Sequence, residues 1–352
     1  MRKQLVTVAA VAAGVLAARG AQAQERYALD GDRVAVYNLA GQVNVEPGSG
    51  SSVTVLVTRG GEDARELSVR RGEADGARTL ALVYPGDRVV YPALGRGTLT
   101  NLNVRSDGTF GGSIGRLPGG GGRQVHIAGS GGGTRAWADV RVQVPAGRTV
   151  TVHLAAGRVD VANVEGDIRV RGNAASIHAT RTRGTLNLDT GSGGIELNGA
   201  RGDIRLDTGS GGVTVNDVGG RTLEVDTGSG GVTGSGIQVE RLHVDVGSGG
   251  VRLAGVAARD VNIDTGSGAV NLRLTRDAES VRIDTGSGGV VLSVPPDFGA
   301  QAEIDTGSGR IHVLVPTRVT RSSRTHFTGR FGNGQGRLLI DTGSGGVQVV
   351  GG

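Results

Sequence analysis

A six-residue motif repeats through the second half of this chain and constrains its fold more than any other feature. The motif Asp-Thr-Gly-Ser-Gly-Gly, or a close variant, recurs at steps of 18 to 21 residues, with one step of 36 before the last copy. Units this short cannot bury a core alone, so neighbouring copies must stack and share one. The copies begin at Asp189, Asp207, Asp226, Asp245, Asp264, Asp284, Asp305 and Asp341.

The residues around each motif alternate between apolar and polar. Positions three and one before the Asp, and six and eight after it, are Val, Ile or Leu in 30 of 32 cases. Such alternation places apolar side chains on one face of a strand. Each repeat is therefore predicted to be a strand, a Gly-rich corner and a second strand. Stacked copies predict an all-β fold, a parallel β-solenoid (single-stranded β-helix) of about 19-residue coils.

Composition and pattern divide the chain into three expected parts. Residues 1–23 have the form of a secretory signal peptide, with Arg2 and Lys3, an apolar stretch and a small-residue cleavage site ending at Ala23. Residues 24–149 are expected to form a β-strand-rich N-terminal region with a Gly-rich excursion at 106–135. Residues 150–352 are expected to form the solenoid repeat domain, with an insertion at 314–337.

Charge and cysteine content exclude several classes of function. The net charge of +5 falls to +2 without Arg2, Lys3 and Arg19, which gives little reason to expect a nucleic-acid partner. The chain has no Cys, hence no disulfide framework and no thiolate metal site. No stretch outside the leader approaches the ~20 apolar residues of a transmembrane helix. We expect export to the periplasm, the cell surface or the extracellular space.

The repeated Asp has three interpretations. Asp-Thr-Gly-Ser resembles the catalytic loop of aspartic proteases, but that chemistry needs two facing loops, whereas eight copies at solenoid spacing should stack in a row. A structural corner is the simpler interpretation, in which Asp and Ser bond local backbone N–H groups and Gly adopts positive φ. The carboxylates should repel one another, and either calcium or the side chains of Arg205, Arg282 and Thr could offset this. No other cofactor is expected.

The insertion at 314–337 interrupts the repeats with five Arg and no acidic residue. Arg side chains and aromatic rings together could bind an anionic glycan or lipid headgroup. The alternative is a solvated loop before the last coil, which then caps the open end of the solenoid. The candidate binding residues are Arg318, Arg321, Arg324, Arg330, Phe327 and Phe331.

Two further short motifs have simpler explanations. Arg201-Gly202-Asp203 spells a cell-attachment tripeptide, which repeats rich in these residues produce by chance. Residues 111–115 match the spacing of a nucleophile elbow, but they lie in a Gly-rich loop without a strand–turn–helix context. Neither motif predicts an activity.

On these patterns the chain resembles the bacterial "putative adhesin" family of exported β-strand-repeat proteins, a domain of unknown function. The resemblance rests on residues 34–45 with their Leu39-Ala40-Gly41-Gln42-Val43 turn, residues 142–152 around Pro145-Ala146-Gly147, and the Gly-Ser-Gly-Gly-Val corners. It implies surface attachment and supplies no catalytic residue.

The sequence therefore favours a non-enzymatic exported β-solenoid that acts in adhesion or in contact with a surface or matrix. Its partner would be an envelope or surface polysaccharide or protein. The alternatives are a periplasmic structural scaffold that binds other envelope proteins and, less favoured, a polysaccharide-active β-helix enzyme.

Overall fold

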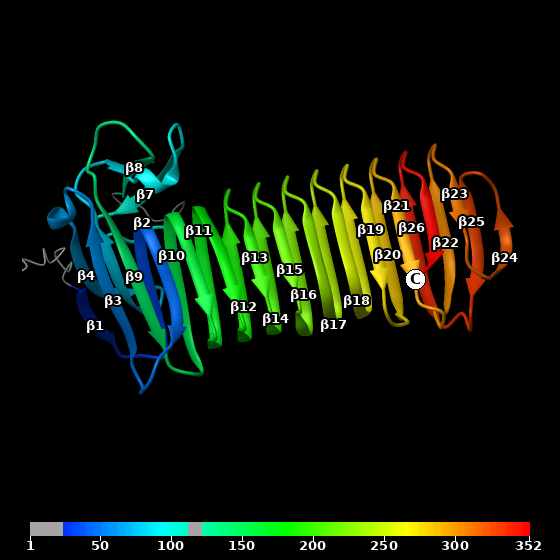
Figure 1. The fold of residues 1–352 in the computed structure, drawn as a ribbon, viewed down its shortest axis with the longest axis horizontal. Helices are drawn as coiled ribbons and strands as arrows, with labels where there is room; N and C mark the ends of the chain where they lie inside the picture. The colour runs from blue at the N-terminus through cyan, green and yellow to red at the C-terminus, as the bar shows by residue number, and fades with distance from the viewer. Residues whose placement is uncertain (1–23, 112–121) are drawn as a thin grey trace, which may run out of the picture.

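A computed structural model describes residues 24–111 and 122–352 of the chain, which form an elongated stack of β-strands (Figure 1). Within these residues, helical structure is limited to two short 3-10 turns, η1 (Ala64–Glu66) and η2 (Pro92–Leu94). The predicted signal peptide, the middle of the Gly-rich excursion and most of the 111–115 motif lie outside the described residues. The all-β prediction is confirmed.

Parallel strands from successive repeats stack in register and form the solenoid. Leu186 is the register partner of Ile204, which in turn pairs with Leu223. These side chains are 1–3% exposed, so the predicted apolar alternation does build one continuous core. The strands of this part are β10 (Arg148–Ala162), β11 (Glu165–Thr180), β12 (Arg183–Thr190), β13 (Ile195–Asn198), β14 (Arg201–Thr208), β15 (Val213–Asn216), β16 (Gly219–Thr227), β17 (Val232–Val246), β18 (Val251–Thr265), β19 (Val270–Leu274), β20 (Ser280–Thr285) and β21 (Val290–Val294).

The stack extends past the predicted start near residue 150. Strand β2 (Arg33–Pro47) pairs in parallel with β10, with Val34 opposite Val150 and Val43 opposite Val159. Beyond β2, antiparallel pairs close this end of the stack. They comprise β1 (Gln24–Leu29), β3 (Val53–Gly60) and β9 (Trp137–Val144), and the hairpin of β4 (Ser68–Ala74) and β5 (Ala77–Val83). A separate sheet contains β6 (Arg88–Val90), β7 (Leu99–Arg105) and β8 (Gly122–Ala128).

The order of coils at the C-terminal end differs from their order along the chain. Strand β26 (Gly336–Thr342) lies between β20 and β22 (Ala300–Thr306), and β27 (Val347–Gly351) lies between β21 and β23 (Ile311–Val313). The last strands of the chain, red in Figure 1, therefore stand inside the stack. The expectation that the last coil caps the solenoid is wrong.

The insertion itself forms the cap. It folds into a hairpin of β24 (Thr317–Ser322) and β25 (His326–Phe331), and β25 pairs antiparallel with β22. The chain first forms the outer coil of β22 and β23, and then turns through the hairpin at the end of the stack. It returns as β26 and β27 to the position between that coil and the coil of β20 and β21. A short connection between repeats could not make this reversal.

The Gly-rich corners do not use positive φ, contrary to the expectation. Within the described chain, none of the motif glycines has a left-handed φ. The glycines are required because the coils stack closely: a Cβ on Gly230 would lie 1.8 Å from the carbonyl oxygen of Gly211. The left-handed glycines occur at another corner, where Gly184, Gly202 and Gly220 have φ of 109°, 139° and 145°.

A buried Thr, present in every motif except the one with Val246, holds the corner backbone, and the Asp does not. The Thr227 hydroxyl accepts a hydrogen bond from the backbone N–H of Gly230 at 3.1 Å. The same hydroxyl donates to the carbonyl of Gly211 in the preceding coil at 3.3 Å. Thr208 makes the equivalent pair of bonds to Gly211 and Gly193. Most of these Thr hydroxyls donate to the neighbouring coil in this way, and those of Thr285 and Thr342 donate within their own corner. This corrects the expectation that Asp and Ser hold the corner.

Candidate functional site

The motif carboxylates form one row along the outside of the stack, as predicted. Asp207 is in register with Asp189 on one side and Asp226 on the other, and the row continues through every repeat. Adjacent parallel strands are ~4.8 Å apart, so the carboxylates are neighbours and never face each other across a cleft. The row does not provide the opposed pair that an aspartic protease needs. In stacking order it contains Asp189, Asp207, Asp226, Asp245, Asp264, Asp284, Asp341 and Asp305.

A cationic or hydrogen-bonding group stands at each end of this carboxylate row. Arg171 on β11 is the register partner of Asp189, where the row begins. At the other end the His326 ring, on the cap hairpin, lies 2.7 Å from the carboxylate of Asp305. Arg282 lies 3.5 Å from Asp284. These groups offset part of the repulsion, whereas the Thr hydroxyls, which were expected to help, bond the corners instead.

Burial and repulsion between neighbouring carboxylates raise the pKa of three Asp residues in the row. Burial, and then the neighbouring carboxylate of Asp207, raises the pKa of Asp189 above its ordinary value. Burial also raises the pKa of Asp226, and the carboxylates of Asp207 and Asp245 raise it further. The pKa of Asp264 is raised in the same way by burial and then by Asp284 and Asp245. Among the described residues, no group of three or more acidic, His or Cys side chains is arranged to hold a metal ion. Calcium binding by the row stays a prediction.

The predicted binding residues of the insertion separate into two groups. Phe327 and Phe331 are 4% and 2% exposed, and Phe331 packs edge-on against Phe298 at a centroid distance of 5.8 Å. Their rings fill the core of the cap. The expectation that they stack on a ligand is therefore wrong. Arg318, Arg321 and Arg324 are exposed.

A hollow of about 680 Å³ brings only part of this set together. Arg318, Arg330 and Phe331 line it beside Pro295, Pro296 and Pro316. Arg321 and Arg324 lie outside its lining, and Arg324 donates instead to the carbonyl of Ser308 at 3.1 Å. The insertion therefore serves mainly as a cap, and two of its Arg side chains lie beside an apolar hollow.

The attachment tripeptide is part of the sheet. Gly202 occupies a left-handed corner, and the Asp203 carboxylate forms an ion pair with Arg221 on the adjacent coil. Arg201 donates to the backbone carbonyls of Ala200 and Asp217. All three residues have structural partners, which agrees with a chance origin of the motif.

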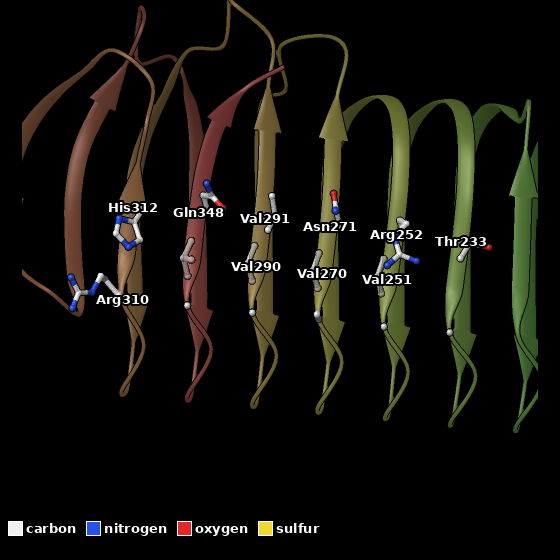
Figure 2. A pocket seen from close by; sticks show the side chains of 16 residues that line it. Thr233, Val251, Arg252, Val270, Asn271, Val290, Val291, Arg310, His312 and Gln348 are labelled. Carbon is white, nitrogen blue, oxygen red and sulfur yellow. The ribbon is translucent and has the colours of Figure 1, made fainter.

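A shallow groove of about 760 Å³ crosses six strands on the face beside the Gly-rich corners (Figure 2). Its floor is the last residue of each motif, which directly precedes a strand. Above the floor, the first outward side chains of successive strands form a row. In stacking order the floor residues are Gly231, Gly250, Ala269, Gly289, Gly346 and Arg310, and the row consists of Thr233, Arg252, Asn271, Val291, Gln348 and His312.

Sequence reasoning missed this groove, although one signal pointed to it. The last position of the motif is Ala at 269 and Arg at 310, while the earlier motif glycines do not vary in the same repeats. Only the register of the coils shows that these positions line up. In Figure 2, Arg310 and His312 stand at one end of the groove and Thr233 at the other.

The geometry defines a class of protein: a β-solenoid with long, repetitive outer faces and a groove that crosses its coils. The chain matches the Toastrack DUF4097 family over residues 148–350. It belongs to this family, whose function is unknown, and the family resemblance inferred from the corners is confirmed.

Other comparisons add little. No curated protein matches the chain. A solved structure, that of a "putative cell adhesion protein" from Clostridium sporogenes, is similar at 9% identity over 94% of this chain and 99% of that one. Its TM-score of 0.20 is too low to support a conclusion about function. Within the described residues, no helix has the length and apolar content needed to cross a membrane.

Proposed function

We propose that this chain is a non-enzymatic exported protein that binds an extended partner at the cell surface or in the surrounding matrix. The groove that crosses six strands is the observation that supports this proposal most directly. An extended ligand can contact several coils at once along such a groove, and repeated weak contacts then add up.

The arrangement of acidic groups favours binding over catalysis. General acid and base residues are usually two groups whose environments push their pKa values apart. Here the motif carboxylates occupy one repeated position in about 19-residue coils, and no acidic side chain lines the groove. A polysaccharide-cleaving activity is therefore not proposed.

A second function, a periplasmic scaffold that binds other envelope proteins, is favoured by the exposed strand at the end of the stack. Strand β24 pairs only with β25, and Val319 on it is 57% exposed. A free strand edge is a template for a strand from another protein, although Arg318 and Arg321 also protect it from indiscriminate pairing.

The cellular compartment in which the protein lies distinguishes the two proposed functions. An epitope inserted in the turn after Ser322 is expected to be labelled by antibody on intact cells if the protein acts at the surface. A periplasmic reporter with the same epitope serves as the control and must stay unlabelled until the cells are permeabilised. Labelling of the chain only after permeabilisation would reject the surface function and favour the scaffold.

A further inference from the structure

The floor of the groove is nearly free of side chains, although its packing is looser than at the other motif glycines. A Cβ added to Gly231, Gly250 or Gly289 would lie 3.2–3.3 Å from the nearest carbonyl oxygen, and none of the three has a left-handed φ. The same position carries a methyl group at Ala269 and a long side chain at Arg310. The fold therefore accepts side chains at some of these positions, and the glycines leave the backbone of the groove open to close approach by a ligand.

The carbonyl groups of the floor offer a ligand little hydrogen bonding. They already accept hydrogen bonds from residues of the preceding coil: the Val251 N–H donates to the carbonyl of Ala269 at 2.9 Å, and the Val270 N–H donates to that of Gly289 at 2.9 Å. A peptide lying along the groove would also cross the strands instead of running beside them, so it could not extend the sheet.

The side chains of the groove are basic or neutral. Arg252 lies beside Thr233 near one end of the groove, Arg310 closes the other end with His312 beside it, and no Asp or Glu lines the groove. Among the described residues neither Arg forms an ion pair, so both guanidinium groups are free to bind an anion. No Phe, Tyr or Trp lines the groove, so the stacking surface that single-stranded nucleic acids use is nearly absent there.

We propose that the groove binds an acidic polysaccharide that runs along the solenoid axis, across the strands. Carboxylates of uronic-acid units pair with Arg252 and Arg310. Sugar hydroxyls exchange hydrogen bonds with Thr233, Asn271 and Gln348, and the bare floor lets the sugar rings lie close to the backbone. Six floor positions are five inter-strand steps, or about 24 Å. The inference rests on the proposed function and names its ligand class.

The direct test is binding of polygalacturonate to the purified protein, with neutral dextran and single-stranded DNA as comparison polymers. We expect polygalacturonate to bind, dextran not to bind, and the affinity to fall as salt is raised. The double variant Arg252→Gln with Arg310→Gln should weaken binding by about tenfold or more. Gly250→Gln, which fills the floor, should weaken it by a similar factor.

Two matched controls separate this site from general effects. Gly194→Gln adds the same side chain at the same motif position, 3.3 Å from a carbonyl as at Gly250, but outside the groove lining. Arg241→Gln removes an exposed charge from β17 on another column. Both should bind within about twofold of the parent. The melting temperature of each variant shows whether it is folded.

Three outcomes would overturn the inference: no binding of polygalacturonate, equal loss in the controls, or DNA binding as tight as polygalacturonate binding. Each is distinct from failure of the proposed function, which is decided by epitope labelling of cells. Groove binding in a protein that is labelled only after permeabilisation would keep the ligand class and reject the surface function. Surface labelling without binding of polygalacturonate would keep the surface function and reject the ligand class.

Discussion

Asp284 and Asp341 are direct register partners on adjacent parallel strands, although five other strands lie between them along the chain. Asp341 pairs on its other side with Asp305. The coil that ends the chain therefore joins two coils that precede it. Strand β25 of the cap pairs with β22, and β22 joins β20 through the inserted strand β26.

This order of coils predicts the effect of a C-terminal truncation. A chain ending at Asn333 lacks β26 and β27, so β22 loses the parallel partner that connects it to β20. Residues 300–331 should then lose amide protection in hydrogen–deuterium exchange, while residues 183–246 keep theirs. If β22 instead stayed protected in the truncated chain, the inserted position of the last coil would not be needed for cap docking.

The two kinds of motif glycine should respond differently to a methyl group. Gly230→Ala places a Cβ 1.8 Å from the Gly211 carbonyl oxygen and should destabilise the protein by roughly 2–4 kcal/mol. Gly231→Ala has 3.2 Å of clearance, and we expect a change within about 0.5 kcal/mol.

Urea unfolding of the two variants measures the difference. Gly228→Val should behave like Gly230→Ala, since a Cβ there lies 2.4 Å from the Gly209 carbonyl oxygen. Equal stability of the Gly230 and Gly231 variants would contradict the close-stacking explanation of the corners.

The carboxylate row predicts a pH dependence with a defined sign. Because the folded-state pKa of Asp226 is raised from 3.8, the folded chain binds more protons than the unfolded chain as pH rises above that value. This group therefore lowers the free energy of unfolding as pH rises through its folded pKa. Asp226→Asn should be more stable than the parent at pH 7, by a few tenths to ~1 kcal/mol at low salt.

The advantage of Asp226→Asn should shrink as pH falls towards 4 and as salt is added. Melting temperatures of parent and variant, measured in parallel from pH 4 to 7, isolate this group from the other titrating residues. A variant less stable than the parent at pH 7 would show that the carboxylate is held by a favourable partner, such as a bound cation.

The cap separates core residues from solvent-exposed ones. Phe331→Ala removes a ring that is 2% exposed and packed against Phe298, so it should destabilise the cap by about 3–5 kcal/mol. Arg321→Ala, at an exposed site on β24, should change stability by no more than about 0.5 kcal/mol. Protease susceptibility of the hairpin reports both effects, and similar susceptibility of the two variants would place Phe331 outside the core.

The amino-acid sequence by itself determined the local unit and its repetition. The apolar alternation around Leu186 and Ile204, together with a motif of fixed length, specified strand, corner and strand. Because the motif and the strand pattern around it keep the same spacing in every repeat, stacking then aligned the Asp of every motif in one row. These features depend on periodicity, which is present in the sequence and independent of which coils become neighbours.

Only the tertiary structure decided which coils are neighbours, and with them the groove and the cap. Ile304 and Ile340 carry the same pattern, so no local signal tells whether β20 pairs with one or the other. The choice is made by long-range pairing and by the hairpin that buries Phe327 and Phe331. The same pairing inserts Gln348 between Val291 and His312 and thereby completes the groove.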